Sequence, residues 1–128
     1  MGRIVVPIEI MNIVDKKSRI ECDILVDTGA SALVLPKAWK RKLGEIETIG
    51  TVEMETADQR LVSGEVCGPV KIQIEGFRPI FNEVVFLDME PKEGIFEPLL
   101  GYIILEQAQA AVDMVGHRLI HVKALDLK

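Results

Sequence analysis

One aspartate in this 128-residue sequence stands where a carboxylate can do chemistry. The apolar run Ile24-Leu25-Val26 leads directly into Asp27, and the small residues Thr28-Gly29-Ala30-Ser31 follow. This pattern predicts a strand that ends at the carboxylate, followed by a tight turn. A side chain at the end of a rigid element is held in a defined position, so Asp27 is our candidate for an acid or base in catalysis.

The small residues after the aspartate have expected roles of their own. Gly29 is expected to adopt an unusual backbone angle and to let other backbone come close. The Ser31 hydroxyl is positioned in sequence to hydrogen-bond the carboxylate, and the Thr28 hydroxyl to reach a neighbouring chain. The alternative is an ordinary Asp-Thr-Gly turn, since the tripeptide alone arises by chance in roughly 2% of such sequences. The apolar residues before it and the small residues after it favour a functional site.

A second motif follows about 70 residues later and adds to the first. It reads Leu99-Leu100-Gly101 and continues into Tyr102-Ile103-Ile104-Leu105. Together with Leu25-Val26-Asp27-Thr28-Gly29-Ala30-Ser31, it makes the chain resemble the retropepsin-like aspartic proteases, in particular the small single-domain members of bacteria and archaea. The resemblance implies an all-β fold, a closed β-barrel with one or two short helices. It covers most of the chain, and we expect residues 1–128 to form a single domain.

The chemistry of such a protease requires two carboxylates that share one proton around a water molecule. This chain contains only one Asp-Thr-Gly. The second half of the site must therefore come from another copy, which predicts a two-fold homodimer with Asp27 of each chain at the axis. The resemblance implies that Thr28 braces this pair across the interface. The predicted function is that of an aspartic endopeptidase acting on peptides or proteins, with no metal and no cofactor.

Family members close over the substrate with a β-hairpin, the flap, and residues 52–62 match it. The resemblance implies substrate contacts from Met54, Thr56, Ala57 and Asp58, with the turn at residues 57–60. A plain surface hairpin is the alternative. The glycine-rich tip of retroviral flaps is missing, and Tyr102 stands where retroviral members have arginine after the glycine. Positions to inspect for side-chain specificity are Val26, Ala30, Met54 and Leu100.

The elements that must position these residues follow from periodicity. Apolar residues alternate with polar ones over residues 4–10, 20–24 and 70–75, which predicts half-buried strands. The continuous apolar run 84–87 predicts a strand covered on both sides, and residues 119–122 predict a late strand. We expect one helix with Pro36 at its first position, Trp39 and Leu43 on one face and Gly44 as its stop. A second short helix is expected from Tyr102 to Ala108.

Composition excludes several classes of protein. A net charge of −5, with 48% hydrophobic and 27% charged residues, indicates a globular domain and argues against a nucleic-acid partner. The longest uncharged apolar run, residues 98–105, is too short to span a membrane, and the first residues lack a secretory signal. The expected location is the cytoplasm.

The remaining reactive or charged side chains are expected to be structural. Cys22 and Cys67 are interpreted as buried free thiols, with a disulfide or redox pair as the alternative, and Cys67 precedes an expected Gly-Pro turn. The basic run at residues 37–42 is interpreted as a solvated helix face, and His117 and His121 as surface residues. Two other functions stay open: a catalytically silent dimeric peptide-binding module on the same fold, and a structural β-barrel in which the motif is accidental.

Overall fold

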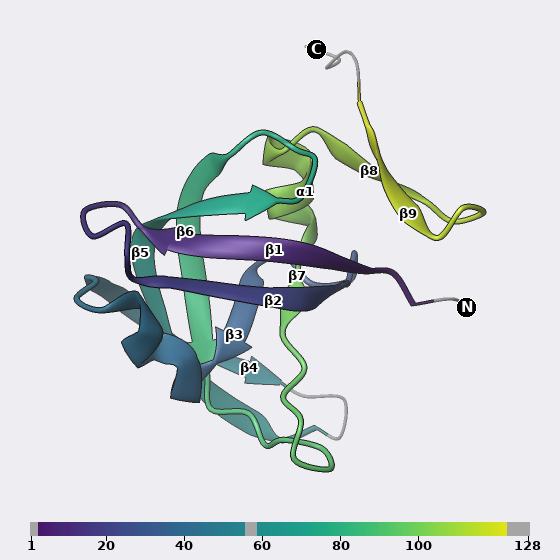
Figure 1. Ribbon diagram of the computed structural model, residues 1–128. Helices are drawn as coiled ribbons and strands as arrows, with labels where there is room; N and C mark the ends of the chain where they lie inside the picture. Colours follow the sequence, from purple (N-terminus) through teal and green to yellow (C-terminus); the bar gives the residue numbers. More distant parts are fainter. Residues whose placement is uncertain (1–2, 56–58, 123–128) are drawn as a thin grey trace, which may run out of the picture.

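A computed structural model describes residues 3–55 and 59–122, and these residues form a β-barrel with two short helices (Figure 1). The all-β class and the barrel are therefore confirmed. The elements in chain order are β1 Val5–Asn12, β2 Arg19–Val26, β3 Leu33–Pro36, η1 Lys37–Leu43, β4 Thr48–Glu55, β5 Leu61–Ile74, β6 Ile80–Leu87, β7 Leu99–Leu100, α1 Tyr102–Gln107, β8 Ala110–Asp113 and β9 Arg118–His121.

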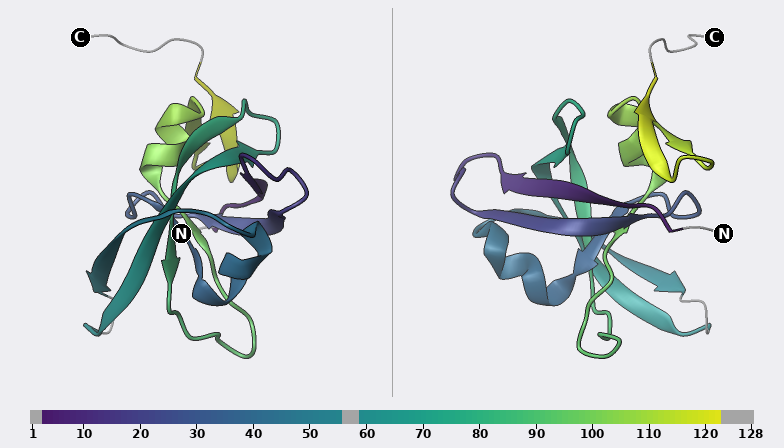
Figure 2. Two further views of the ribbon diagram at one scale, coloured as in Figure 1. Left: turned by 90° about the vertical axis from the view of Figure 1, so that its left-hand side faces the viewer. Right: turned by 45° about the vertical axis from the view of Figure 1, so that its right-hand side comes forward.

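Six strands close the barrel in the order β1-β2-β7-β3-β6-β5, because β5 also pairs with β1. Neighbouring strands are antiparallel except for β2 with β7 and β3 with β6, which run parallel. β4 lies outside this ring and pairs with the first half of β5, whereas β8 and β9 form a separate hairpin. The β4–β5 hairpin extends from the end of the barrel opposite α1, and the end of β2 lies at a level between them (Figure 2).

The barrel interior is filled by the apolar side chains that alternate along the strands. Ile8 and Ile10 of β1, Ile20 and Ile24 of β2, and Ile72 of β5 are all buried there, as the period of two predicts. In β6, the side chains of Val84 and Phe86 point into the barrel, while Val85 belongs to a second cluster outside it. The expectation that this run is covered on both sides is therefore confirmed.

The second apolar cluster lies between the β4–β5 hairpin and the sheet. Its buried members are Val34 of β3, Val66 of β5 and Val85 of β6. Half-buried side chains pack against them from the hairpin, from the sheet and from the segment after β6: Ala32, Val52, Met54, Leu87, Met89 and Leu99. The inner face of the hairpin is thus apolar, and it covers one face of the strands next to Asp27.

The expected turn at Gly68-Pro69 is wrong. β5 continues through both residues as one strand, with a register shift against β6 between Cys67 and Val70. Proline lacks the N–H that a regular ladder needs, so a bulge is where a strand accommodates it. As a result the hairpin arm and the barrel wall are one continuous strand of 14 residues.

The two helices differ in how well they match expectation. α1 spans Tyr102–Gln107 with Ala108 as its C-cap, as predicted. η1 is a 3-10 helix that begins at Lys37. Pro36 ends β3 and is the N-cap of η1, whereas the sequence suggested it as the first helical residue. Leu43 is buried, Trp39 packs partly against the core, and Gly44 ends the helix at a φ of +66°, so the expected apolar face and stop are confirmed.

Both cysteines are free thiols, with Cys67 buried and Cys22 half-buried. His117 and His121 are exposed, and the His121 ring stacks on Phe77 at 4.3 Å between centroids. Across the described ranges, every helix is too short or too polar to span a membrane.

Candidate active site

Asp27 lies directly after the last residue of β2, as the sequence predicts. Its backbone N–H donates a hydrogen bond to the Leu100 carbonyl at 3.0 Å, and the Val26 N–H donates to the Ile4 carbonyl at 2.9 Å. β7 lies beside the end of β2, where Leu25 pairs with Leu99 and Val26 with Leu100 in parallel register. The end of β2 is therefore held from both sides, by the segment before β1 and by the second motif.

The loop after Asp27 is docked onto the start of α1. The Tyr102 N–H donates to the Ala30 carbonyl at 2.9 Å, and the Ile103 N–H donates to the Ser31 carbonyl at 3.2 Å. The first amides of a helix have no partner within the helix, so these two loop carbonyls satisfy them. The two sequence motifs, separated along the chain, are thus joined by backbone hydrogen bonds.

Gly101 makes this close docking possible. A Cβ atom at this position would lie 2.4 Å from the Ser31 carbonyl carbon and 2.5 to 2.6 Å from the backbone O and N of Ala32. Those atoms are backbone and have no alternative rotamer. Only glycine fits here, so the glycine of the second motif exists to let α1 approach the active-site loop.

The Asp27 carboxylate has one partner within the described chain: the Gly29 N–H donates to its Oδ1 at 3.0 Å. Gly29 does not need the left-handed backbone angle that the sequence suggested, because its φ is not positive. A Cβ at this position would lie 3.2 Å from Asp27 Oδ1, so a larger residue would press on the carboxylate and shift it by a few tenths of an ångström. The expected Ser31 hydrogen bond is not formed among the described residues. Ser31 instead contributes its backbone carbonyl to α1.

Exposure differs between the members of the loop. Asp27 and Ala30 are half-buried, whereas Thr28, Gly29 and Ser31 are exposed. Thr28 forms no side-chain hydrogen bond with the residues the structure describes, so its hydroxyl is available to a group from another molecule. Leu100, which we selected as a specificity position, is fully buried in the barrel and supports the loop from below.

The predicted flap is a regular antiparallel hairpin, with Glu55 opposite Leu61 at its outermost described pair. Met54 is half-buried on its inner face, whereas Thr56, Ala57 and Asp58 lie outside the described residues, so their substrate contacts stay predictions. Leu87 and Met89 join Met54 in the second apolar cluster. The sequence reasoning missed both. Leu87 ends the apolar run 84–87 and could have been found there.

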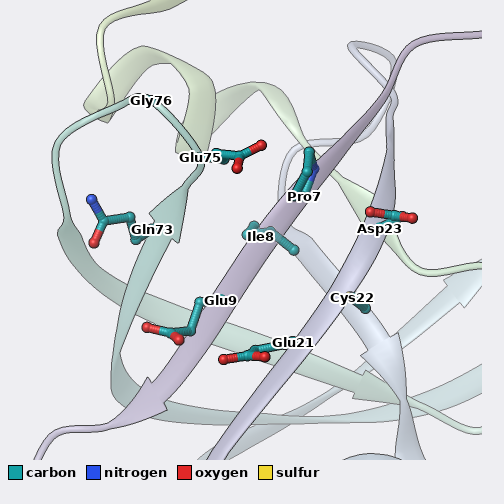
Figure 3. Close-up of a pocket in the computed structure, with 9 residues that line it drawn as sticks. All are labelled: Pro7, Ile8, Glu9, Glu21, Cys22, Asp23, Gln73, Glu75 and Gly76. Atoms are coloured by element: carbon teal, nitrogen blue, oxygen red, sulfur yellow. The ribbon is translucent and has the colours of Figure 1, made fainter.

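A hollow lies on the outer surface of the barrel wall, and Asp27 is not among the residues that line it (Figure 3). It lies over β1, β2 and β5 and is bordered by the carboxylates of Glu9, Glu21, Asp23 and Glu75. Burial raises the pKa of the Cys22 thiol beside it to about 11, with the Asp23 charge acting in the same direction, so the thiol is protonated and a poor nucleophile. Within the described ranges no group of three or more His, Cys, Asp or Glu side chains could hold a metal ion.

Comparison with known proteins agrees with this geometry. A search of the curated proteins gives no match. Among solved structures, EIAV protease in complex with the inhibitor HBY-793 is similar at a TM-score of 0.61 and 22% identity, over 83% of this chain and 88% of that one. This likeness shows that the retroviral protease fold is shared. A family model described as aspartyl protease matches residues 9–103, which include both motifs and the whole hairpin. The chain therefore belongs to the aspartyl protease family, with a retropepsin-like fold.

Proposed function

We propose that this protein is an aspartic endopeptidase that acts as a homodimer and hydrolyses peptide bonds with a water molecule activated between the Asp27 carboxylates of its two subunits. The observation that carries the proposal is the form of the half-site. Backbone hydrogen bonds to Leu100 and to the start of α1 hold Asp27 and its loop, yet the chain has only one Asp-Thr-Gly. A single fixed carboxylate supplies half of a two-carboxylate reaction.

The reaction needs the two carboxylates in different protonation states. Two like charges that lie close together do not both ionise, so the pair holds one shared proton and titrates as a unit. The ionised carboxylate takes a proton from water, whose oxygen attacks the peptide carbonyl carbon, while the protonated carboxyl gives its proton to the carbonyl oxygen. Proton transfer to the amide nitrogen then accompanies cleavage of the C–N bond and releases an acid and an amine.

Thr28 is the proposed contact between the two loops. Its side chain is exposed next to Asp27 and forms no hydrogen bond with the described part of its own chain. In a two-fold dimer, each hydroxyl would meet the partner's loop and fix the separation of the two carboxylates. The carboxylates would then be held by backbone within each subunit and by Thr28 between subunits.

The proposed substrate is an extended peptide that binds between the hairpin and the sheet. The side chains between the hairpin and the sheet are apolar, with Val52 and Met54 from the hairpin packed in one cluster with Leu87, Met89 and Leu99. Apolar pockets with a few polar groups bind apolar side chains and leave the backbone to hydrogen bonds. We therefore expect cleavage between apolar residues.

The test is cleavage of a peptide library by the wild type, by Asp27→Asn and by Asp23→Asn, from about pH 4 to 7. Asp23→Asn is the matched control, since Asp23 is an exposed aspartate on β2, the strand that leads to Asp27, and the same charge is removed. We expect cleavage by wild type and Asp23→Asn and none by Asp27→Asn. Peptide binding without cleavage by a folded dimer would favour a silent binding module, and cleavage by Asp27→Asn would contradict the mechanism.

Mixing the subunits tests whether both carboxylates are needed. When wild type and Asp27→Asn are mixed in equal amounts and allowed to exchange, about one quarter of the dimers contain two intact aspartates. Activity should then fall to about one quarter of that of the same total of wild-type chains. A fall to one half would mean that each chain works alone, and a strict monomer in a solution-mass measurement would contradict the dimer directly.

A further inference from the structure

A polar cluster joins η1 to the root of the β4–β5 hairpin. Lys40 Nζ lies 2.8 Å from Glu65 Oε2 and 3.4 Å from Thr48 Oγ1, and Lys37 Nζ lies 3.5 Å from Glu65 Oε1. One carboxylate on β5 is therefore paired with two ammonium groups of η1, each at a different oxygen. The basic face of the helix is largely exposed, as expected, since Lys37, Arg41 and Lys42 are exposed, but Lys40 is half-buried and paired with Glu65.

Glu65 lies where β5 leaves the barrel. β5 pairs with β6 from Gly64 to Ile72, whereas among the described strands β4 alone pairs with Leu61, Val62 and Ser63. On the β4 side, Thr48 lies at the corresponding root, next to a register shift. The cluster is thus at the position about which the outer hairpin would pivot, since a two-stranded ribbon with no third strand is weakly held.

The cluster contacts the face of β5 opposite the substrate space. Gly64 and Val66 face β6 and the second apolar cluster, and alternation along the strand turns Glu65 the other way. η1 therefore supports the hairpin from behind. η1 itself is fixed, because it follows β3 directly and buries Leu43 in the barrel core. β3 pairs with β7, which is bonded to the Asp27 loop.

We propose that Glu65, Lys40 and Lys37 are positioning residues that set the angle of the hairpin over the Asp27 loop, and so determine how well the free enzyme is prepared to bind a peptide. This inference rests on the proposed function. Loss of the cluster allows the hairpin more orientations, and substrate binding must then restrict them. The steps at the carboxylates are unchanged once the peptide is bound, so the effect falls on KM and not on kcat.

The test compares Glu65→Gln with Glu53→Gln. Glu53 is an exposed carboxylate on the same hairpin, and none of the described residues forms an ion pair with it. We expect Glu65→Gln to raise KM about two- to fivefold, the range for a partly exposed ion pair, with kcat retained. Lys40→Met, which leaves Glu65 in place, should do the same. Because salt screens such pairs, the KM of the wild type should rise with ionic strength and that of Glu65→Gln should not.

Hydrogen exchange separates this inference from the proposed function. In Glu65→Gln, the amides of Val62, Met54 and Val52, which alternation directs into the β4–β5 ladder, should exchange faster than in wild type and Glu53→Gln, while those of β1 should not change. This readout works even if no peptide is cleaved, in which case the proposed function fails and the positioning role is judged by exchange alone. Equal exchange in all three proteins, or a loss of kcat with unchanged KM, would overturn the inference.

Discussion

The Asp27 loop and the β4–β5 hairpin are held by different kinds of interaction. Backbone hydrogen bonds hold the loop, from Leu100, Tyr102 and Ile103, around a glycine that admits no other residue. Backbone pairing of β5 with β6 ends at Gly64, and beyond it the hairpin depends mainly on side chains, through apolar contacts on its inner face and the Lys40–Glu65 pair at its root. The loop is therefore built for fixed geometry, and the hairpin can move when its side-chain contacts change.

This difference suits the two tasks that we propose. Catalytic groups must stay within a fraction of an ångström of their working position, and backbone bonds inside a packed structure provide that precision. A cover over the site must open for substrate entry, and such elements belong to the less stable parts of a fold. The substitutions below test this contrast, from the largest expected effect to the smallest.

Gly101→Ala should have the largest effect. The new Cβ would meet the backbone of Ser31 and Ala32 at 2.4 to 2.6 Å, so the loop and α1 must separate. We expect a loss of about 3 kcal/mol in the free energy of unfolding and of about a hundredfold in kcat/KM. The control is Gly50→Ala on the hairpin, where a Cβ has nothing within 4 Å. Denaturant melts and peptide hydrolysis measure both, and similar behaviour of the two variants would contradict the contrast.

Thr28→Ala should affect assembly more than folding. The side chain is exposed and forms no contact by hydrogen bond within the described chain, so its loss leaves the subunit stable. If it braces the dimer, the dissociation constant should rise about tenfold for two lost hydrogen bonds. Thr28→Ser keeps the hydroxyl and is the control. Sedimentation of wild type and both variants across a dilution series would measure the dissociation constants. Equal values for wild type and Thr28→Ala would show that Thr28 does not brace the interface.

Gly64→Ala should have a smaller effect than Gly101→Ala, although both add one methyl group. At Gly64 a Cβ would lie 3.0 Å from Val85 Cγ1 and 3.2 Å from Leu87 Cδ1, and both are side chains that can shift. The third neighbour is the Phe86 carbonyl oxygen at 3.2 Å. We expect a cost of about 1 kcal/mol in unfolding free energy and a raised KM as the hairpin tilts. An effect as large as that of Gly101→Ala would show that the hairpin root is as rigid as the loop.

The smallest effect is a pH dependence of stability from Glu65. Its hydrogen bond to Lys40 holds the pKa of the carboxyl below the ordinary value of 4.5, and the same bond raises the pKa of Lys40 above 10.5. The stabilisation is complete above pH 4.5 and is lost as the pH falls through the lowered pKa of Glu65. At the alkaline end it is complete below pH 10.5 and is lost as the pH rises through the raised pKa of Lys40.

The measurement is the difference in melting temperature between wild type and Glu65→Gln as a function of pH. It should be small and constant from about pH 5 to 9 and should shrink below pH 4. Glu53→Gln should show no such profile. A difference that persists unchanged at pH 3 would mean that packing, and not the ion pair, explains the effect of the substitution.

Local patterns predicted the parts of this protein that depend on local chemistry. Alternation located β1, β2 and the second half of β5, the apolar run located β6, and Gly44 marked the end of η1. The strand-to-turn pattern also placed Asp27 at the end of β2. The Gly68-Pro69 pair was misleading, because these residues signal a turn in isolation, whereas pairing with β1, β4 and β6 keeps β5 extended through them.

The sequence by itself determined the alternating strands, the single Asp-Thr-Gly and the presence of both motifs of one protease family. These features depend on residue types and on their order along the chain. Only the tertiary structure decided which groups meet. It showed that Gly101 is needed for space beside the active-site loop, that Ser31 contributes its backbone carbonyl, and that Lys40 pairs with Glu65 25 residues away. Such contacts follow from the closure of the barrel, which brings together residues whose separation along the chain carries no signal.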